Sequence, residues 1–150
     1  MSDKGNTDKL VERQLTGIVI GGFYEVYNDL GFGFLESVYR RGMYYELTAR
    51  GLYVEEEYPI DVRYKQWKAG HFRADLLVER KLIVKTKSTR TLGPEDFRQP
   101  INYLRSTGIQ VGMLLHFGPK ARHYRYVCTT SSQDPSERLI HVHESSDQER

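Results

Sequence analysis

Apolar and polar positions along the chain follow two different periods. In residues 8–30 apolar side chains recur every three or four positions, the period of a helix with one buried face. Residues 35–50 have the same period and are followed by Gly51, a residue type that commonly ends helices. A third helical stretch begins at Pro94, carries acids in its first turn and ends at Gly108. We therefore predict three helices.

Other stretches have the period of two that is typical of strands. Residues 53–65 and 122–128 alternate between apolar and polar side chains, as half-buried or edge strands do. Residues 111–117 are apolar on both faces, which places them at the centre of a sheet. Residues 72–87 contain two runs rich in branched side chains, joined by a short charged turn. With a further turn at residues 66–70, the pattern predicts an α/β fold with a mixed sheet of four or five strands flanked by three helices.

Three glycines interrupt the first helical stretch, at Gly17, Gly21 and Gly22. Each lowers helix propensity by about 1 kcal/mol relative to alanine. Close packing against another backbone would explain why they are present.

Charged side chains gather at one end of the hairpin predicted for residues 72–87. If its turn centres near Arg80, antiparallel pairing places Asp75 opposite Lys85. Lys85 and Lys87 are two apart on a strand and therefore share a face, with Asp75 beside them. The sequence thus predicts one carboxylate and two ammonium groups close together.

Three motifs give the chain a resemblance to a known family. Asp75, Lys85 and Lys87 have the spacing of the Asp-x9-Glu-x-Lys motif of PD-(D/E)XK nucleases. The segment Gly33-Phe-Leu-Glu36-Ser-Val-Tyr39 fits a GxxExxY signature, and Gln99-Pro-Ile-Asn-Tyr103 fits the QxxxY element of RecB-like nucleases. From about Ile18 to Val127 the chain resembles the GxxExxY family of the PD-(D/E)XK superfamily.

This resemblance implies a restriction-endonuclease-like core and hydrolysis of phosphodiester bonds in DNA or RNA. It implies Asp75 as a ligand of Mg²⁺ or Mn²⁺, Glu36 as an accessory ligand and Lys87 as the catalytic lysine. Gln99 and Tyr103 would orient the substrate. Such chemistry uses the metal to polarise the phosphate and to generate hydroxide, while a cation stabilises the developing charge.

Position 85 departs from the family pattern, because a lysine stands where the motif has glutamate. A unit charge pair at about 4 Å is worth about 4 kcal/mol at an effective dielectric constant of about 20. Exchanging glutamate for lysine changes the local charge by two units. The resulting loss of binding energy for a metal ion exceeds about 4 kcal/mol, which is the binding free energy of a millimolar metal affinity. We therefore expect weakened metal binding and impaired cleavage.

Two alternatives to an active nuclease follow from this departure. The first is a catalytically inactive domain that binds nucleic acid, DNA in preference to RNA, through Arg73, Lys85, Lys87 and Arg90. The second is a protein-interaction domain that forms a homodimer through a tyrosine-rich surface.

Because Asp75 would be kept for chemistry, we expect Asp75→Ala to change the stability of the fold little. A large loss of stability would indicate that Asp75 forms a structural ion pair.

Several side chains have two interpretations. Glu25 is either a second accessory acid or the partner of Arg40 or Arg41, and Tyr39 either contacts ligand or belongs to the core. Trp67 either stacks on a base or packs on a neighbouring strand.

Composition adds little to this picture. The net charge is +2, and residues 131–150 contain five acids and two bases, so residues 1–130 are mildly basic. A basic domain is compatible with a polyanionic partner. The single Cys128 excludes an internal disulfide. With no long apolar run and no apolar signal segment, we expect a cytoplasmic protein without a membrane partner.

The order of the patterns predicts a flexible N-terminus at residues 1–7, one nuclease-like domain at 8–128 and a polar, disordered tail at 129–150. Within the tail, residues 139–143 are an alternative short extra strand containing His141 and His143, whose spacing also occurs in metal sites.

Overall fold

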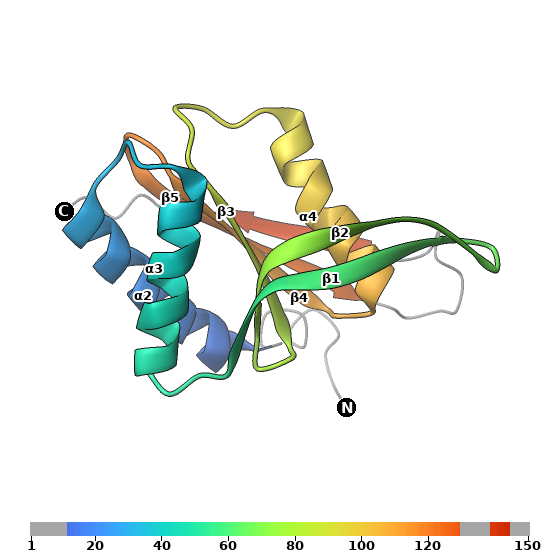
Figure 1. Ribbon diagram of the computed structural model, residues 1–150. Helices are drawn as coiled ribbons and strands as arrows, with labels where there is room; N and C mark the ends of the chain where they lie inside the picture. The colour runs from blue at the N-terminus through green and yellow to red at the C-terminus, as the bar shows by residue number, and fades with distance from the viewer. Residues whose placement is uncertain (1–11, 130–138, 145–150) are drawn as a thin grey trace.

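The computed structural model describes residues 12–129 and 139–144. Within these residues, three helices and one six-stranded sheet are formed (Figure 1). In chain order the elements are α2 (Arg13–Leu30), α3 (Glu36–Ala49), β1 (Val54–Tyr64), β2 (Trp67–Val78), β3 (Leu82–Lys87), α4 (Pro94–Thr107), β4 (Val111–Phe117), β5 (Ala121–Thr129) and β6 (Leu139–Glu144).

The sheet is mixed, and its strands lie side by side in the order in which they occur in the chain. Every neighbouring pair is antiparallel except β3 and β4, which are parallel. A parallel pair needs a long connection, and α4 is that crossover. The predicted α/β class, with three helices and a mixed sheet, is confirmed.

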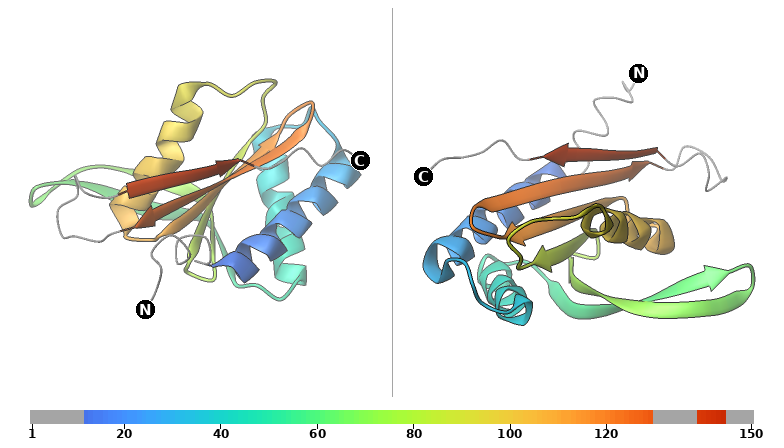
Figure 2. Two further views of the ribbon diagram at one scale, coloured as in Figure 1. Left: turned by 180° about the vertical axis from the view of Figure 1, so that it is seen from behind. Right: turned by 90° about the horizontal axis from the view of Figure 1, so that it is seen from above.

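Two apolar cores lie on opposite faces of the sheet. Helices α2 and α3 cover one face and α4 covers the other (Figure 2). Because strand side chains alternate between faces, Leu82 and Val84 pack under α2 and α3, whereas Ile83 between them packs under α4. On the first face Tyr39 stacks on Phe117, with ring centroids 4.2 Å apart. Both faces of β4 are buried, as predicted for a central strand.

Strand β5 is not the edge strand that its alternation predicted. Residues 139–144, within the stretch expected to be a polar tail, form β6 and pair with β5 from Tyr124↔Glu144 to Thr129↔Leu139. The alternative of a short extra strand is the one found. Alternation of apolar and polar residues indicates that one face of a strand is buried. It gives no information on whether a later segment of the chain pairs with the edge of that strand. The side chains of His141 and His143, like residues 1–11, lie outside the described part of the chain.

The predicted turn at residues 66–70 is shorter in the structure. Only Lys65 and Gln66 form it, and Lys65 has the positive φ of 54° that such tight turns require. Residues 67–70 belong to β2, where Trp67 pairs with Tyr64 and Lys68 with Arg63. Cross-strand backbone pairing outweighs the low strand propensity of Ala69 and Gly70.

Among the described residues, no helix is both long enough and apolar enough to cross a membrane.

Candidate active site

The candidate site lies where β2 and β3 separate. Their pairing spans only three residue pairs and ends at Leu76↔Val84. Beyond that point β2 continues with β1 as a long hairpin, while β3 continues beside β4 as far as Lys87 (Figure 1). Asp75 and Lys85 are the first residues after the last pair. Asp75 and Lys85 therefore face each other, as predicted, at the point where β2 and β3 diverge, here called the fork.

The carboxylate of Asp75 is built into this fork. Asp75 is only 9% exposed, and its Oδ2 accepts hydrogen bonds from the backbone N–H of Thr86 at 2.7 Å and from the Thr86 hydroxyl at 2.9 Å. These bonds replace the ladder bonds that the diverging strands no longer make. Thr86 was not singled out from the sequence; its only signal is its place between the two motif lysines.

Lys85 joins two acids from different elements. Its Nζ lies 3.0 Å from Oε1 of Glu36 and 3.5 Å from Oδ2 of Asp75. Glu36 is in the first turn of α3, where a carboxylate also interacts favourably with the helix dipole. Glu36, Asp75 and Lys85, here called the triad, thus bring α3, β2 and β3 together around one ammonium group.

The electrostatic environment keeps Lys85 charged. Burial by itself lowers the pKa of Lys85, but the charges of Asp75 and Glu36 and the hydrogen bond to Glu36 outweigh burial, so the pKa lies above its ordinary value. Tyr103 is buried beside the triad and stacks on Phe72 at 4.1 Å. Burial raises the pKa of Tyr103, Lys85 lowers it, and Asp75 and Glu36 raise it further, with a net increase. Both groups are therefore protonated at neutral pH.

Lys87 does not share the carboxylate of Asp75, contrary to the predicted convergence of both lysines on it. Its Nζ lies 3.4 Å from Oδ1 of Asp96 in the first turn of α4. The other oxygen of Asp96 accepts the backbone N–H of Gly93 at 2.8 Å and so caps the helix. The crossover places this acid over the end of β3, a position that strand periodicity alone does not reveal. On β4, the register partner of Lys87 is His116.

The remaining candidates for substrate contact, Gln99, Arg73 and Arg90, take no part in the two ion pairs of the triad. Gln99 is exposed on α4 and lines, together with Tyr103 and Phe72, an open pocket of about 410 Å³. Arg73 is exposed and lies 3.8 Å from Glu57, and the guanidinium of Arg90 lies 5.8 Å from the ring of Phe32.

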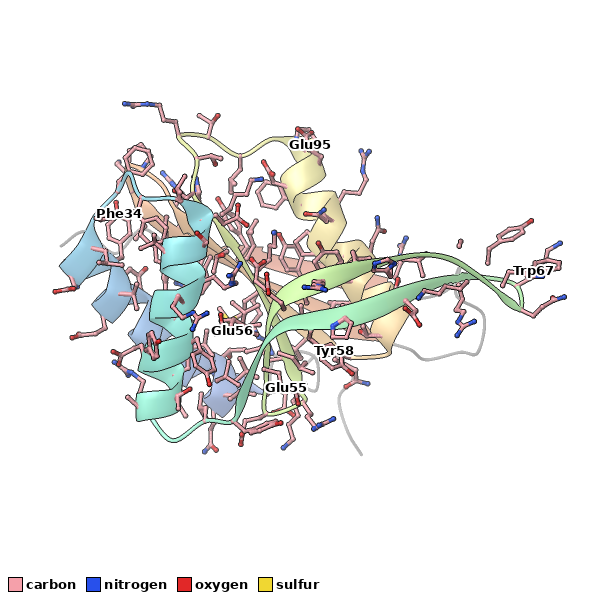
Figure 3. The ribbon with its side chains drawn as sticks, in the orientation of Figure 1. Phe34, Glu55, Glu56, Tyr58, Trp67 and Glu95 are labelled. Carbon is pink, nitrogen blue, oxygen red and sulfur yellow. The ribbon has the colours of Figure 1, made fainter. Side chains whose placement is uncertain are left out.

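Packing bears on the interpretations of Glu25 and Tyr39. Glu25 is exposed, and Arg40 and Arg41 instead pair with Glu56 at 3.5 and 3.4 Å (Figure 3 labels Glu56 beside α3). Glu25 therefore does not form the ion pair considered from the sequence. Tyr39 is fully buried, so it belongs to the core.

Tyr39 also explains how the GxxExxY segment is held. Its hydroxyl donates to the carbonyl of Gly31 and accepts the backbone N–H of Phe34, which ties down the loop between α2 and α3. Gly33 in that loop has a φ of 121°, a conformation that favours glycine. The loop and the start of α3 direct Glu36 toward Lys85.

The residues present do not fit a divalent metal ion. Within the described residues, no three side chains of the types His, Cys, Asp or Glu are grouped as metal ligands. Asp75 and Glu36 are both paired with Lys85, and Oδ2 of Asp75 also accepts two bonds from Thr86. An incoming Mg²⁺ would meet an ammonium group in the position between the two carboxylates, and like charges repel.

Comparison with known proteins bears on the family to which the chain belongs. A family model described as the PD-(D/E)XK nuclease superfamily matches residues 13–127, which run from the start of α2 into β5. No curated protein and no solved structure matches the chain. Nucleases of this superfamily generally use divalent metal ions. Since the match covers most of the chain and includes the forked strands, the chain belongs to the PD-(D/E)XK nuclease superfamily.

Proposed function

We propose that this chain is a nucleic-acid-binding member of the superfamily whose metal-dependent cleavage is impaired by Lys85. The observation that carries the proposal is the ammonium group of Lys85, 3.0 Å from Glu36 and 3.5 Å from Asp75. It supplies from within the chain the positive charge that a metal ion would supply between these carboxylates. DNA is the proposed ligand, and its affinity is to be compared with that of RNA. We also propose that the chain is a member of the GxxExxY family, on the basis of Gly33, Glu36 and Tyr39.

The balance of charges supports impaired cleavage. A divalent ion about 4 Å from an ammonium group is repelled by about 8 kcal/mol at an effective dielectric constant of about 20. A millimolar affinity represents only about 4 kcal/mol. Metal binding therefore requires Lys85 to leave both carboxylates, which breaks its two ion pairs. Lys87, the lysine at the motif's catalytic position, is also held away from Asp75 by Asp96.

The first experiment compares wild type, Lys85→Glu and Lys85→Met on labelled single- and double-stranded DNA with Mg²⁺ or Mn²⁺. Wild type is expected to bind DNA without cutting it. In Lys85→Glu three carboxylates meet, so we expect divalent ions to raise its melting temperature, because a ligand that binds only the folded state stabilises it. Lys85→Met removes the charge without adding a ligand, so it serves as the control and should show no metal response.

Cleavage by wild type would contradict impairment. If divalent ions changed the melting temperature of all three proteins equally, Lys85 would not be the residue that controls metal binding. Recovery of cleavage in Lys85→Glu alone would identify Lys85 as the disabling change. Absence of any binding to DNA or RNA would contradict the proposed function itself.

Salt dependence separates this proposal from the protein-interaction alternative. Binding to phosphates releases counterions and weakens steeply as salt rises. Dimerisation through apolar side chains does not weaken in this way. Measuring DNA affinity and the molar mass of the protein across a salt series therefore distinguishes the two.

A further inference from the structure

The β1–β2 hairpin projects away from the rest of the molecule (Figures 1 and 2). The register pair Ile60↔Phe72 is the last that packs on the core under α4. From residue 61 to residue 71 no side chain is buried, yet the two strands stay paired as far as Tyr64↔Trp67. This outer part, here called the hairpin tip, is held by strand pairing and contributes nothing to either core.

Two large aromatic side chains are exposed at the hairpin tip. Tyr64 is 60% exposed and Trp67 is 57% exposed, and they flank the two-residue turn. Figure 3 shows Trp67 at the far end of the hairpin, away from the helices. Residues directly opposite in an antiparallel pair project from the same face, so the two rings belong to one surface. Trp67 belongs to neither core, and beside its register partner Tyr64 on the neighbouring strand it keeps 57% of its surface exposed.

Positive charge accompanies these rings. The hairpin tip contains Arg63, Lys65 and Lys68 against the single acid Asp61, which lies 3.4 Å from Lys68. Nearer the body, each of the three glutamates of β1 is paired with an arginine: Glu55 with Arg80, Glu56 with Arg40 and Glu57 with Arg73. The unbalanced charge of this hairpin is therefore concentrated at its exposed end.

We propose that the hairpin tip binds single-stranded nucleic acid, with Trp67 and Tyr64 stacking on bases and Lys65, whose Nζ lies 5.4 Å from the centre of the Tyr64 ring, contacting phosphates. The inference rests on the proposed nucleic-acid binding and adds where and how the strand is held. Aromatic rings beside a basic groove or ribbon are the general means of holding single strands, because every base offers a face for stacking. A base within a duplex is already stacked, so unpaired bases are the better ligands. A second copy of the chain is a poor partner, since a symmetric contact between two tips would bring like charges together.

The test uses Trp67 as its own reporter, because it is the only tryptophan in the chain. Unlabelled single-stranded DNA is titrated into the full-length protein while tryptophan fluorescence is followed, and binding is measured in parallel by anisotropy of a labelled strand. We expect quenching that saturates together with binding. Trp67→Ala should weaken binding about tenfold, which equals about 1.4 kcal/mol, and Trp67→Phe should retain most of the affinity because its ring still stacks.

Tyr45→Ala is the matched control, because Tyr45 on α3 is 61% exposed and lies outside the hairpin. It should leave affinity unchanged, whereas Tyr64→Ala should lower it. Trp67 has no core contacts, so circular dichroism should show the fold of Trp67→Ala unaltered.

DNA binding with constant Trp67 fluorescence and unchanged affinity of Trp67→Ala would overturn this inference and leave the proposed function in place. No binding to DNA or RNA would overturn both. Quenching by anionic phospholipid vesicles but not by single-stranded DNA would also overturn it, in favour of a membrane surface.

Discussion

Asp75 holds the fork of the sheet together. Its carboxylate accepts two hydrogen bonds from Thr86 and lies 3.5 Å from the ammonium group of Lys85, with little exposure to solvent. The sequence had suggested that Asp75→Ala would change stability little, because a metal-binding acid is held for its chemistry. The contacts reverse that expectation, since removing the carboxylate leaves the two buried donors of Thr86 without their acceptor and the largely buried ammonium group of Lys85 with Glu36 as its remaining ion-pair partner.

We predict that Asp75→Ala lowers the free energy of unfolding by about 3 kcal/mol. Urea denaturation measures this change, and Asp61→Ala on the exposed hairpin tip is the control, expected within about 0.5 kcal/mol of wild type. The double variant Asp75→Ala/Lys85→Met should lose less than the sum of the single variants, because each single variant already removes the ion pair between Asp75 and Lys85. A loss below about 1 kcal/mol in Asp75→Ala would contradict a structural role.

At the scale of elements, α2 and α3 approach each other through a glycine. A Cβ at Gly22 would lie 3.0 Å from a methyl group of Leu47 on α3, whereas a Cβ at Gly17 would have no atom within 4 Å. The sequence predicted close packing of these glycines against another backbone. The neighbours at Gly22 and Gly21 are instead side chains of α3 and of Arg50.

This difference predicts unequal effects on stability for two substitutions on the same helix. Gly17→Ala should raise the free energy of unfolding by about 1 kcal/mol, because alanine favours the helix and displaces nothing. Gly22→Ala gains the same propensity but forces Leu47 to move within a packed core, which costs about 1–3 kcal/mol. Thermal or urea unfolding should therefore rank Gly17→Ala above wild type and Gly22→Ala below Gly17→Ala. Equal gains at both positions would show that the helices adjust freely.

The stability of the whole molecule is coupled to pH through a buried histidine. His116 on β4 is buried, and its Nε2 lies 2.7 Å from the carbonyl oxygen of Thr89, which makes this nitrogen the donor. Burial lowers the pKa of His116, the bond to Thr89 and the charge of Asp96 raise it, and Arg122 lowers it; the net change is a decrease. Burial also lowers the pKa of His123.

A lowered pKa makes the protein less stable in acid. Below the ordinary histidine pKa of about 6.5, the unfolded chain takes up a proton that the folded state resists. The contribution of His116 is therefore complete above that pH and is lost as the pH falls toward its folded pKa. In His116→Gln, whose amide can still donate to Thr89, unfolding free energies measured from pH 7 downward should fall less steeply than in wild type. His71→Gln, at an exposed position on β2, should follow the wild-type slope.

At the scale of the whole molecule, the parts of the fold that depend on local sequence patterns could be predicted. Periods of three to four and of two residues along the chain gave the helices and strands to within a few positions, and antiparallel pairing about a turn near Arg80 placed Asp75 beside Lys85. Strand β5 was wrongly assigned to the edge because its burial pattern is the same with or without β6 beside it. The turn after β1 was predicted too long because Trp67–Gly70 gain their strand conformation from the register with β1, not from their own propensity.

The sequence by itself determined the fold class, because hydrophobic periodicity is a property of the linear chain. Through its resemblance to a known family and the match of a family model, it also determined the superfamily and the identity of the residue that interrupts the metal motif. The tertiary structure alone decided what Lys85 and Lys87 contact. Glu36 lies 49 positions from Lys85 in the chain and meets it only because α3 packs over the forked sheet. Asp96 reaches Lys87 only because the α4 crossover returns over β3. Ion pairs act over a few ångströms, so the partner of a charge is fixed by which elements the fold brings together.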